Sequence, residues 1–409
     1  MGWKGQFASA VARKRITELG RVTSPEGTLD AFLPWAPLLG ITRLADITGL
    51  DYIGIPVWAA VMPNSRSLAV LQGKGVTPEA ARASALMEAV ERYHGEHVLK
   101  PVILATYNDL EFRQRVVPVD QLPRCRDGLF HADFRLPWIA AADLLSMNEV
   151  LVPYELVHCD YTLPQVEGSG CFLATTTGLA SGNHEVEASV AALAEVIERD
   201  AVALFRRLNA QQRARRRLDL ASVDDGTCKA LLELYTRAAI EVAVWDITSN
   251  IGTAAFLCRI GEASENRRPR VGSSWGVGCH PSRRIALLRA LTEAAQSRVT
   301  VIAGARDDIS SDHYLSAPIE RRGSAARHRR NPVKRLFSHV PTIEHDNIGE
   351  ALEWMIGRLK SAGIHSVARV DLTHESIGIP VVRMVVPGLE GMSTSPNYLP
   401  GSRAKGRSL

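Results

Sequence analysis

Acidic residues that could bind a cation recur in three segments of the chain. Each segment follows one template: any residue, alanine, leucine, any residue, glutamate, two small or apolar residues, then glutamate or glutamine. The segments are SALMEAVER (84–92), AALAEVIER (191–199) and RALTEAAQS (289–297). All three carry an alanine seven residues before the aligned glutamate. A single ExxER motif usually decorates a solvated helix face, but three copies with the same preceding alanine indicate a shared structural unit.

If the three segments meet, several carboxylates share one region. At about 4 Å and an effective dielectric constant near 20, each like-charged pair costs on the order of 4 kcal/mol, so the cluster must bind cations or protons. Oxygen ligands without matching histidine or cysteine favour hard ions, Mg²⁺ above Ca²⁺. The carboxylates are Glu88, Glu91, Glu187, Glu195, Glu198 and Glu293. The cationic residues that would suit a bound triphosphate are Lys74, Arg92, Arg199, Arg289 and Arg298.

Helices must position these side chains. In the first copy Leu86, Val90 and Tyr93 fall on one face while the glutamates fall on another, and the other two copies repeat this division. A glycine-bearing segment precedes each helix, at 73–75, 178–183 and 276–281. We expect turns there whose backbone amides face an anion. The predicted unit is a glycine-rich loop that leads into a helix.

A second similarity links the two ends of the chain. ADITGLDYIGIPV (45–57) resembles VDLTHESIGIPV (370–381), which predicts two strand-turn-strand units that pair or pack as equivalents. The predicted fold class is α/β, in the α+β sense, with mixed sheets and three glycine-loop/helix units around one site. We expect one interwoven unit over 1–409. It would comprise an N-terminal segment with a strand pair (1–70), a binding core (71–305), a basic connector (306–340) and a C-terminal segment with a strand pair and tail (341–409).

The composition is that of a folded protein, since 46% of the 409 residues are hydrophobic and 22% are charged. The net charge is +4, and the window 321–335 alone has seven basic residues and no acid, so we assign the basicity to this loop. The loop is either a solvated connector or a contact for an acidic partner, and its lack of interleaved aromatic residues argues against nucleic acid. With no apolar run of membrane-spanning length and six scattered cysteines, we expect a cytoplasmic protein without a membrane partner.

Neither a Walker-type GxxxxGK[ST] motif nor a kinase signature is present, so a nucleotide site here is of another kind. Three long motifs instead resemble the YcaO family of ATP-dependent enzymes. They are GKGxxxxxAxxSAxxEAxER (73–92), TTGLASGNxxxEAxxxALxExIERDA (176–201) and RALTEAAQSR (289–298). The similarity extends from Ala45 to Gly391, and the motifs stand in the family's order.

This resemblance implies ATP and Mg²⁺ as cofactors. It places Mg²⁺ on Glu88, Glu91, Glu195 and Glu198, with Glu187 in or next to that shell. It implies phosphate contacts from Lys74, Ser84, Arg199 and Arg289, and a nucleotide pocket shaped by Asn183 and Gln296. Glu293 and Arg298 either join this pocket or form a buried ion pair that supports their helix. The residues expected to be catalytic are Glu88, Glu91, Glu198, Arg199 and Arg289.

Finer resemblance points to the subgroup of the family found beside TfuA proteins. The stretches that carry it are RVTSPEGTL (21–29), RLADITGLDYIGIPV (43–57), GARDD (304–308) and VVPGLEG (385–391). It implies that ATP phosphorylates the oxygen of a peptide backbone amide and that sulfide then attacks, giving a thioamide. The implied partners are a TfuA-like protein, a ribosomally made peptide or protein substrate and a sulfide source. Family analogy also suggests a homodimer.

Several alternatives stay open. Attack by a substrate cysteine or serine would give an azoline, as in the family's cyclodehydratases, although the tail PNYLPGSRAKGRSL lacks the proline run that many of them carry. Accessory factors for ribosomal-protein methylthiolation and non-catalytic nucleotide-binding scaffolds are further readings. His184 and His280 are either candidate general bases or ordinary loop histidines, and Cys279 is either a sulfur relay or a buried thiol.

Overall fold

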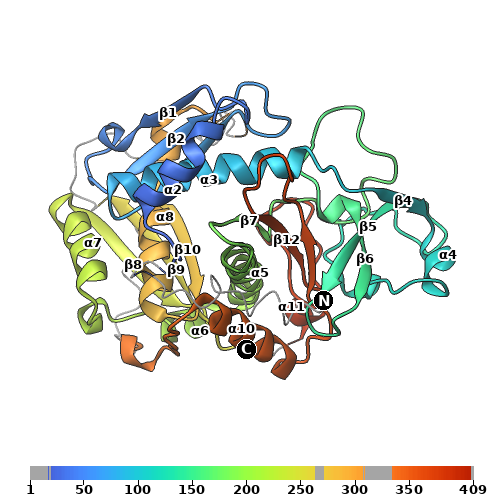
Figure 1. The fold of residues 1–409 in the computed structure, drawn as a ribbon. Coiled ribbons are helices and arrows are strands. Elements are labelled where there is room, and N and C mark those ends of the chain that lie inside the picture. The colour runs from blue at the N-terminus through green and yellow to red at the C-terminus, as the bar shows by residue number, and fades with distance from the viewer. Residues whose placement is uncertain (1–16, 18–19, 263–270, 307, 309–333, 407–409) are drawn as a thin grey trace.

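The computed structural model describes residues 17, 20–262, 271–306, 308 and 334–406, and its strands form three sheets (Figure 1). Two sheets have three strands each, in the orders β1-β2-β3 and β10-β9-β8. The third has six, in the order β4-β5-β11-β12-β7 with β6 paired to β5. The α+β fold class is confirmed. All pairings between these strands are antiparallel rather than mixed, and most paired strands follow one another along the chain.

Each of the three helices predicted from the repeat follows the last strand of a three-strand unit. The first unit contains β1 (Arg43–Asp46), β2 (Val57–Val61), β3 (Val70–Lys74) and α3 (Pro78–Glu96). The second contains β8 (Ile240–Asp246), β9 (Ala254–Glu262), β10 (Ser274–His280) and α8 (Arg283–Ala303). The third combines β11 (Ala368–Asp371) and β12 (Val381–Val385) with β7 (Leu179–Ser181) and α5 (Glu185–Arg207). Strands near the C-terminus thus complete a unit whose helix lies mid-chain.

The similarity between the chain ends comes from equivalent places in two of these units. The two segments form the β1–β2 and β11–β12 hairpins, which lie in different sheets and do not pair with each other. A third copy, WDITSNIGTAA (245–255), joins β8 to β9. Its loop is shorter than the loops of the other two copies, so the sequence similarity is harder to recognise. In every copy the aspartate accepts the amide of the threonine two residues on, at 2.9 to 3.0 Å; these are Asp46, Asp246 and Asp371.

The glycines before two of the helices lie in strands and not in loops. Gly73 belongs to β3, and Gly276 and Gly278 belong to β10. A Cβ atom on Gly73 would lie 2.0 Å from the amide nitrogen of Ala85, and one on Gly276 would lie 2.2 Å from that of Ala294. The glycines therefore let a helix pack directly onto its strand. The prediction that these segments are amide-lined anion loops was wrong for that reason.

Local signals set the starts of the helices. The Thr77 hydroxyl caps α3, and Pro78 occupies its first turn, where no amide hydrogen is needed. The His184 ring caps α5 by accepting the amide of Val186 at 3.2 Å. Helix α2 (Pro25–Phe32) is capped by the hydroxyl of Ser24. Each cap fixes where a helix begins and therefore which of its faces the downstream glutamates occupy.

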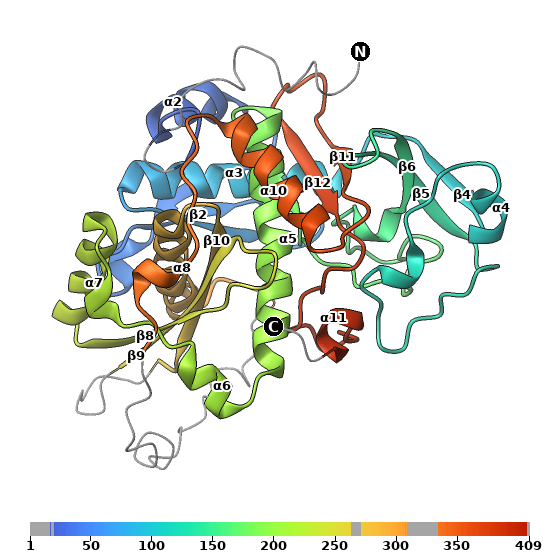
Figure 2. The ribbon, with the colours of Figure 1, turned by 90° about the horizontal axis from the view of Figure 1, so that it is seen from below.

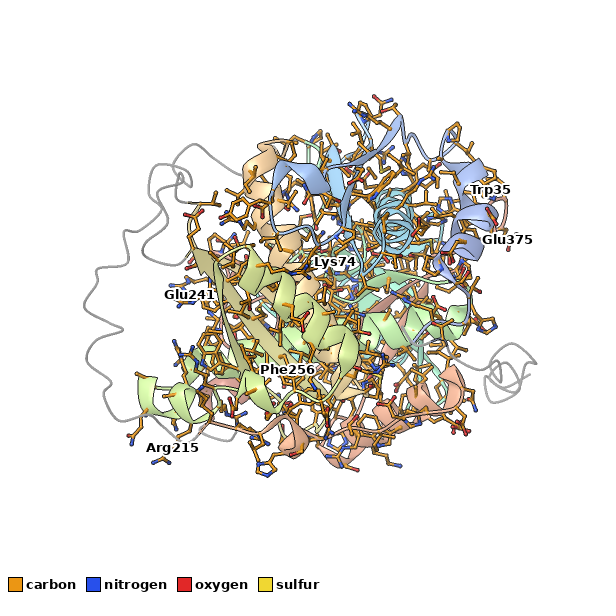
Figure 3. The ribbon with its side chains drawn as sticks, turned by 90° about the vertical axis from the view of Figure 1, so that its left-hand side faces the viewer. Trp35, Lys74, Arg215, Glu241, Phe256 and Glu375 are labelled. Carbon is orange, nitrogen blue, oxygen red and sulfur yellow. The ribbon has the colours of Figure 1, made fainter. Side chains whose placement is uncertain are left out.

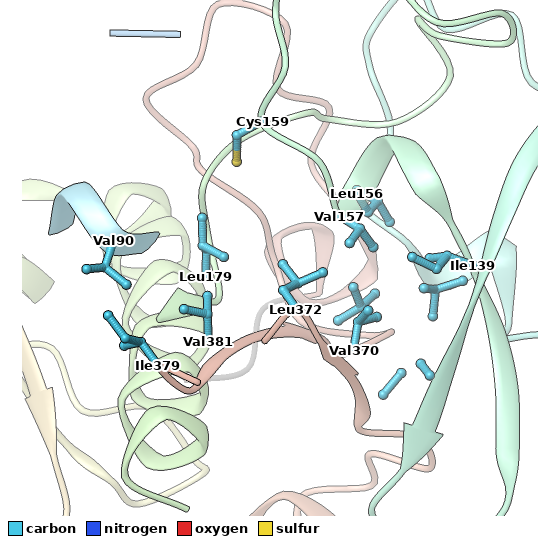
Figure 4. Close-up of a cluster of buried hydrophobic side chains, with 14 of the residues drawn as sticks. Val90, Ile139, Leu156, Val157, Cys159, Leu179, Val370, Leu372, Ile379 and Val381 are labelled. Atoms are coloured by element: carbon cyan, nitrogen blue, oxygen red, sulfur yellow. The ribbon is translucent and has the colours of Figure 1, made fainter. Parts of the chain in front are cut away.

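Helix α5 crosses the middle of the molecule, between the β8–β9–β10 sheet and β12 (Figures 1 and 2). Its buried Leu193 and Ile197 belong to one apolar core with Val382. A second core lies against the six-stranded sheet, where Val90 of α3 packs near Val381 (Figure 4). Because β12 takes part in both cores, the backbones of α3 and α5 are fixed relative to each other.

The remaining elements surround this centre. The six-stranded sheet extends outward through β5 (Leu136–Asp143), β6 (Glu149–Pro153) and the edge strand β4 (Val102–Ala105). The other helices are α4 (Tyr107–Glu111), α6 (Ala210–Arg215), α7 (Gly226–Arg237), α10 (Ile348–Ser361) and α11 (Ser402–Lys405). None of the helices in the described ranges combines the length and apolarity that a bilayer span requires.

The C-terminal residues are held against α5 through Asp200. The guanidinium of Arg403 donates to both carboxylate oxygens of Asp200, at 2.8 and 2.9 Å, and Asp200 is fully buried. The Glu390 carboxylate accepts the amide of Ala404 and the hydroxyl of Tyr398. Of the predicted basic connector, only residues 306, 308 and 334–340 are described, and the arginines at 321–330 lie outside the described residues.

Candidate functional site

One cavity of about 730 Å³ lies among α3, α5, α8 and the segment that leads into α2. It is lined by residues that are distant in the sequence but belong to equivalent places in the three units. Among its lining residues are all twelve site residues named from the sequence: Lys74, Ser84, Glu88, Glu91, Asn183, Glu187, Glu195, Glu198, Arg199, Arg289, Glu293 and Gln296. Lys74 appears near the centre of the view in Figure 3, whereas Arg215 and Glu241 appear toward its edge.

Helix α3 contributes Glu88 and Glu91 to the cavity. One Glu91 oxygen accepts the Ser181 amide at 2.8 Å and the Ser181 hydroxyl at 2.9 Å, so the last residue of β7 holds this carboxyl in place. The Glu88 side chain is 44% exposed, and its one ion pair among the described residues is with Arg92, at 3.9 Å. One of the two glutamates of this helix is therefore fixed, and the other is free to reorient toward a ligand.

Helix α5 contributes a tight ionic group. Arg199 lies 3.0 Å from Glu195 and 3.2 Å from Glu198. The second oxygen of Glu195 accepts the Gly178 amide at 3.1 Å. One guanidinium thus balances two carboxylates, which leaves this part of the cavity with net negative charge.

Helix α8 presents both signs of charge. Glu293 pairs with Lys74 at 2.6 Å and accepts the Val277 amide at 3.2 Å, so its charge is neutralised by the neighbouring unit. The amide of Gln296 donates to the Gln72 carbonyl at 2.7 Å. Arg289 lines the cavity and forms no close ion pair or side-chain hydrogen bond with a described residue, although its charge lowers the pKa of Glu198. An anionic ligand would satisfy it.

The electrostatics of the cluster show a deficit of positive charge on the α3 and α5 side. Burial, reinforced by Glu88, raises the pKa of Glu91 to about 8. Burial also raises the pKa of Glu198 to about 7, against the opposing effect of Arg199. Burial would raise the pKa of Glu293 as well, but Lys74 and Arg199 outweigh it and lower that pKa. Without a further cation, Glu91 and Glu198 hold protons near neutral pH.

The segment before α2 closes one end of the cavity, and the sequence did not mark it as part of the site. Glu187 accepts the Val22 amide at 2.8 Å and the Arg21 guanidinium at 3.1 Å, and it is 2% exposed. Asn183 accepts the hydroxyl of Thr28 at 3.0 Å. Arg21 has no counterpart in the repeat, so only its position in the RVTSPEG stretch could have indicated that it belongs to the site. As placed, Glu187 fastens this segment to α5.

The arrangement of the carboxylates decides whether the cavity suits a hard divalent cation. No three carboxylate, histidine or cysteine side chains in the described ranges converge on one point that a bare ion would fill. The cause is visible in the ion pairs above, which hold the glutamates apart. The residues nevertheless fit Mg²⁺ with a phosphate ligand, since Glu88, Glu91, Glu195 and Glu198 all line one cavity with carboxylate oxygens, and two of these carboxyls have raised pKa values. Mg²⁺ commonly takes one or two carboxylates and completes its shell with phosphate oxygens and water.

Three other residues named from the sequence have structural roles. Arg298 does not line the cavity; it is buried and lies 3.0 Å from both Asp51 and Glu262. The ring of His184 caps α5 and is not among the lining residues. Cys279 is fully buried, and burial raises the pKa of its thiol well above the usual range, so the thiolate needed for a sulfur relay is disfavoured.

His280 lines the cavity, but its surroundings disfavour a role as base. Burial, together with Arg289, lowers its pKa to about 3. Its Nδ1 atom accepts the Ser282 amide at 3.0 Å, so in the neutral ring the proton lies on Nε2. The Nε2 atom of the neutral His280 ring is therefore a hydrogen-bond donor and has no free lone pair that could accept a proton.

Comparison with known proteins identifies the family of this chain. Residues 72–390 match the family model described as "YcaO cyclodehydratase, ATP-ad Mg2+-binding". An uncharacterized protein from the tfuA 3′ region of Rhizobium leguminosarum bv. trifolii is 36% identical, and the alignment covers 90% of this chain and 88% of that protein. An uncharacterized protein of Methanothermobacter thermautotrophicus is 35% identical over 91% of this chain and 95% of its own length. The chain therefore belongs to the YcaO family.

Solved structures show the same fold. A heterocyclase in complex with substrate and cofactor superposes with a TM-score of 0.76 at 24% identity, covering 92% of this chain. The present chain spans only 53% of that heterocyclase. YcaO from Methanopyrus kandleri, bound with AMPPCP and Mg²⁺, superposes with a TM-score of 0.68 at 22% identity, covering 91% of this chain and 92% of the other.

Proposed function

We propose that the protein uses ATP and Mg²⁺ to activate a peptide backbone amide and converts it to a thioamide with sulfide, together with a TfuA-like partner. One observation carries the first half of this proposal: a single cavity joins two buried carboxyls with raised pKa values to Arg289, which forms no close ion pair with a described residue. Such a cavity fits a metal-bound triphosphate. Similarity to a protein from a tfuA region supports the second half.

The roles of individual residues follow from their charge and position. Glu88, Glu91, Glu195 and Glu198 would hold Mg²⁺, and Glu187 would position α5 beside them. Lys74, Ser84, Arg199 and Arg289 would contact the phosphates. Asn183, Glu293 and Gln296 would shape the nucleotide pocket through the hydrogen bonds already described. When bound, Mg²⁺ would neutralise phosphate charge and polarise the transferred phosphoryl group.

The chemistry needed is the removal of an amide oxygen, which is a poor leaving group until it is phosphorylated. The γ-phosphoryl group of ATP is transferred to that oxygen, sulfide bonds to the carbonyl carbon, and the C–O bond breaks with release of phosphate. Arg199 and Arg289 would stabilise the charge that develops on the phosphoryl oxygens. His280, as an N–H donor on the cavity wall, would orient an oxygen and would not accept a proton.

An azoline-forming cyclodehydratase is the second candidate. The family description and the heterocyclase fold favour it. The C-terminal residues argue against azoline formation, because no described residue beyond Ile348 lines the cavity. Residues 390–406 are instead held against α5 by the Arg403–Asp200 ion pair, and the Ala404 amide bonds to Glu390 within the same segment. The nucleophile alone separates the two outcomes.

Mass spectrometry of reaction products tests the proposal. The protein, a TfuA-like protein, ATP, Mg²⁺ and sulfide would be incubated with candidate peptides. Thioamide formation replaces one oxygen with one sulfur and adds about 16 Da, whereas azoline formation loses one water molecule, about 18 Da. Glu91→Gln and Glu198→Gln should abolish either product. Undiminished Mg²⁺-dependent ATP hydrolysis in both variants would refute the catalytic role of this cavity.

A further inference from the structure

A second cluster of positive charge lies on the surface at the C-terminal end of α5. Residues 206–217 contain six arginines and no acid, which exceeds the net charge of +4 for the whole chain. Five of the six are exposed; we name them the arginine face: Arg206, Arg207, Arg213, Arg215 and Arg217. The basicity of the chain therefore does not belong to the 321–335 loop alone.

Nearby acids do not neutralise the arginine face. Asp219 lies 3.7 Å from Lys334, and the fully buried Asp246 lies 2.8 Å from Arg335. Asp200, on the same helix as Arg206, is bound to Arg403. Within the described ranges no arginine of the face has a carboxylate within ion-pair distance. Exposed like charges that are left together in this way favour an acidic partner.

A row of aromatic rings connects this face to the cavity. The guanidinium of Arg213 lies 5.7 Å from the centre of the Phe205 ring, and that ring lies 6.3 Å from Trp245. Trp245 stacks on Trp275 at 6.1 Å, with 26° between the ring planes. Trp275 lines the cavity and is 45% exposed. An exposed tryptophan supported by a second ring is a ready contact for a peptide chain.

We infer that the arginine face binds an acidic segment of the peptide substrate, and that the chain from this segment passes over Trp275 into the cavity. This inference rests on the proposed function for the identity of the substrate. The step from the Arg213 guanidinium to Phe205 and the two ring-to-ring steps that follow correspond together to about six residues of extended peptide, so the acidic segment lies at least that far from the modified amide. The arrangement gives the substrate a sequence requirement outside the reacting residue.

Peptide fits this surface better than nucleic acid. Of the three rings, Phe205 is 6% exposed and Trp245 is only partly exposed, so Trp275 alone offers an open face. Surfaces that bind single strands stack successive bases on several aromatic side chains. The arginine face lies on the C-terminal end of α5, on α6 and just after it (Figure 2), and Figure 3 shows Arg215 at the edge of the molecule.

Fluorescence anisotropy with labelled peptides tests the inference in the full-length protein. The probes are a glutamate-glycine peptide, the same peptide with glutamine for glutamate, and the acidic peptide extended by about six apolar residues. Arg206→Gln/Arg207→Gln/Arg215→Gln should weaken binding of the acidic probe about tenfold at low salt. The matched control, Arg113→Gln/Arg115→Gln/Arg126→Gln, removes three exposed charges from the segment between β4 and β5 and should change binding of the acidic probe less than about twofold.

The path over the tryptophan has its own readout. Trp275→Ala should weaken the extended probe and leave the short acidic probe unchanged. Equal loss in the test and control triple variants, or equal binding of the glutamine probe, would overturn the inference. A thymidine oligonucleotide that binds more tightly than the acidic probe and is lost with the arginine face would overturn it in favour of nucleic acid. Nucleotide binding is measured separately. A protein that binds the acidic peptide but not Mg²⁺-ATP would refute the proposed function, while the inference that the arginine face binds an acidic peptide would still hold.

Discussion

Replacing Glu91 with glutamine separates its effect on folding from its effect on ligand binding. The glutamine oxygen can still accept the Ser181 amide and hydroxyl, so the change removes only the ionisable proton. In the ligand-free protein Glu91 is protonated at neutral pH, because burial and Glu88 raise its pKa to about 8. We therefore expect Glu91→Gln to fold well and yet to lose Mg²⁺-dependent nucleotide binding.

The size of the effect on stability follows from the pKa of Glu91. The folded-state pKa is raised from 4.5 to about 8, so the stabilisation present below pH 4.5 is lost as the pH rises through about 8. From pH 6 to pH 8 the unfolded glutamate is ionised while the folded one is mostly protonated. Each pH unit then costs about 1.4 kcal/mol, which amounts to about 2 kcal/mol over this range. Glutamine does not ionise, so the variant should avoid this loss.

Urea denaturation at pH 6, 7 and 8, without metal or nucleotide, measures this difference. The free energy of unfolding of the variant, relative to wild type, should increase by about 2 kcal/mol between pH 6 and pH 8. Glu241→Gln, at an exposed position on β8, is the matched control and should show no such trend. If the wild type and Glu91→Gln have parallel pH profiles, Glu91 is not a buried protonated carboxyl, and the argument for a missing cation fails.

Three further results are expected. Binding of Mg²⁺ with a non-hydrolysable ATP analogue should release protons near pH 7, since the two carboxyls with raised pKa values must ionise to bind the metal. Calorimetry in buffers of different ionisation enthalpy measures the number of protons released. Proton release that does not diminish toward pH 9 would contradict this prediction. Gly276→Ala should destabilise the fold by about 3 kcal/mol because its Cβ would meet the Ala294 nitrogen, whereas Gly226→Ala, which has open space, should cost less than about 1 kcal/mol in the same urea titration. Arg403→Gln should destabilise by about 3 kcal/mol, because it leaves the carboxylate of Asp200 buried without a cation, and an unchanged unfolding midpoint would show that the contact contributes nothing.

Much of the site was predictable because its residues belong to a repeat. The shared template identifies which glutamates are equivalent, and helical spacing places them on one face. The alanine seven residues earlier has a physical reason that the structure supplies: Ala81, Ala188 and Ala286 are fully buried, each in the first turns of its helix. Sequence reasoning recognised the helices and misassigned the glycines, because a glycine in a strand and a glycine in a turn look alike until the packing partner is known.

Features that depend on long-range contact were beyond the sequence. The single-unit organisation stays a prediction, although β11 and β12 complete a sheet with β7 from the middle of the chain. Arg21 reaches the cavity through Glu187, more than a hundred residues away, and no local pattern announces such a contact. Arg298 carries the same charge as Arg289 on the same helix, but only the fold shows that Asp51 and Glu262 surround it.

The unequal charges of three otherwise equivalent helices give the cavity a direction. Helices α3 and α5 each keep the second glutamate of the template, Glu91 and Glu198, and both of these carboxyls have raised pKa values. Helix α8 has Gln296 at that place, and Glu293 is already neutralised by Lys74. If the cavity binds Mg²⁺ and ATP as proposed, this asymmetry would place metal ions on the α3 and α5 side and phosphates toward Arg289 and Lys74. A symmetric set of helices with identical charges would bind a triphosphate in several orientations, so the substitution of one glutamate by glutamine is what would select a single orientation.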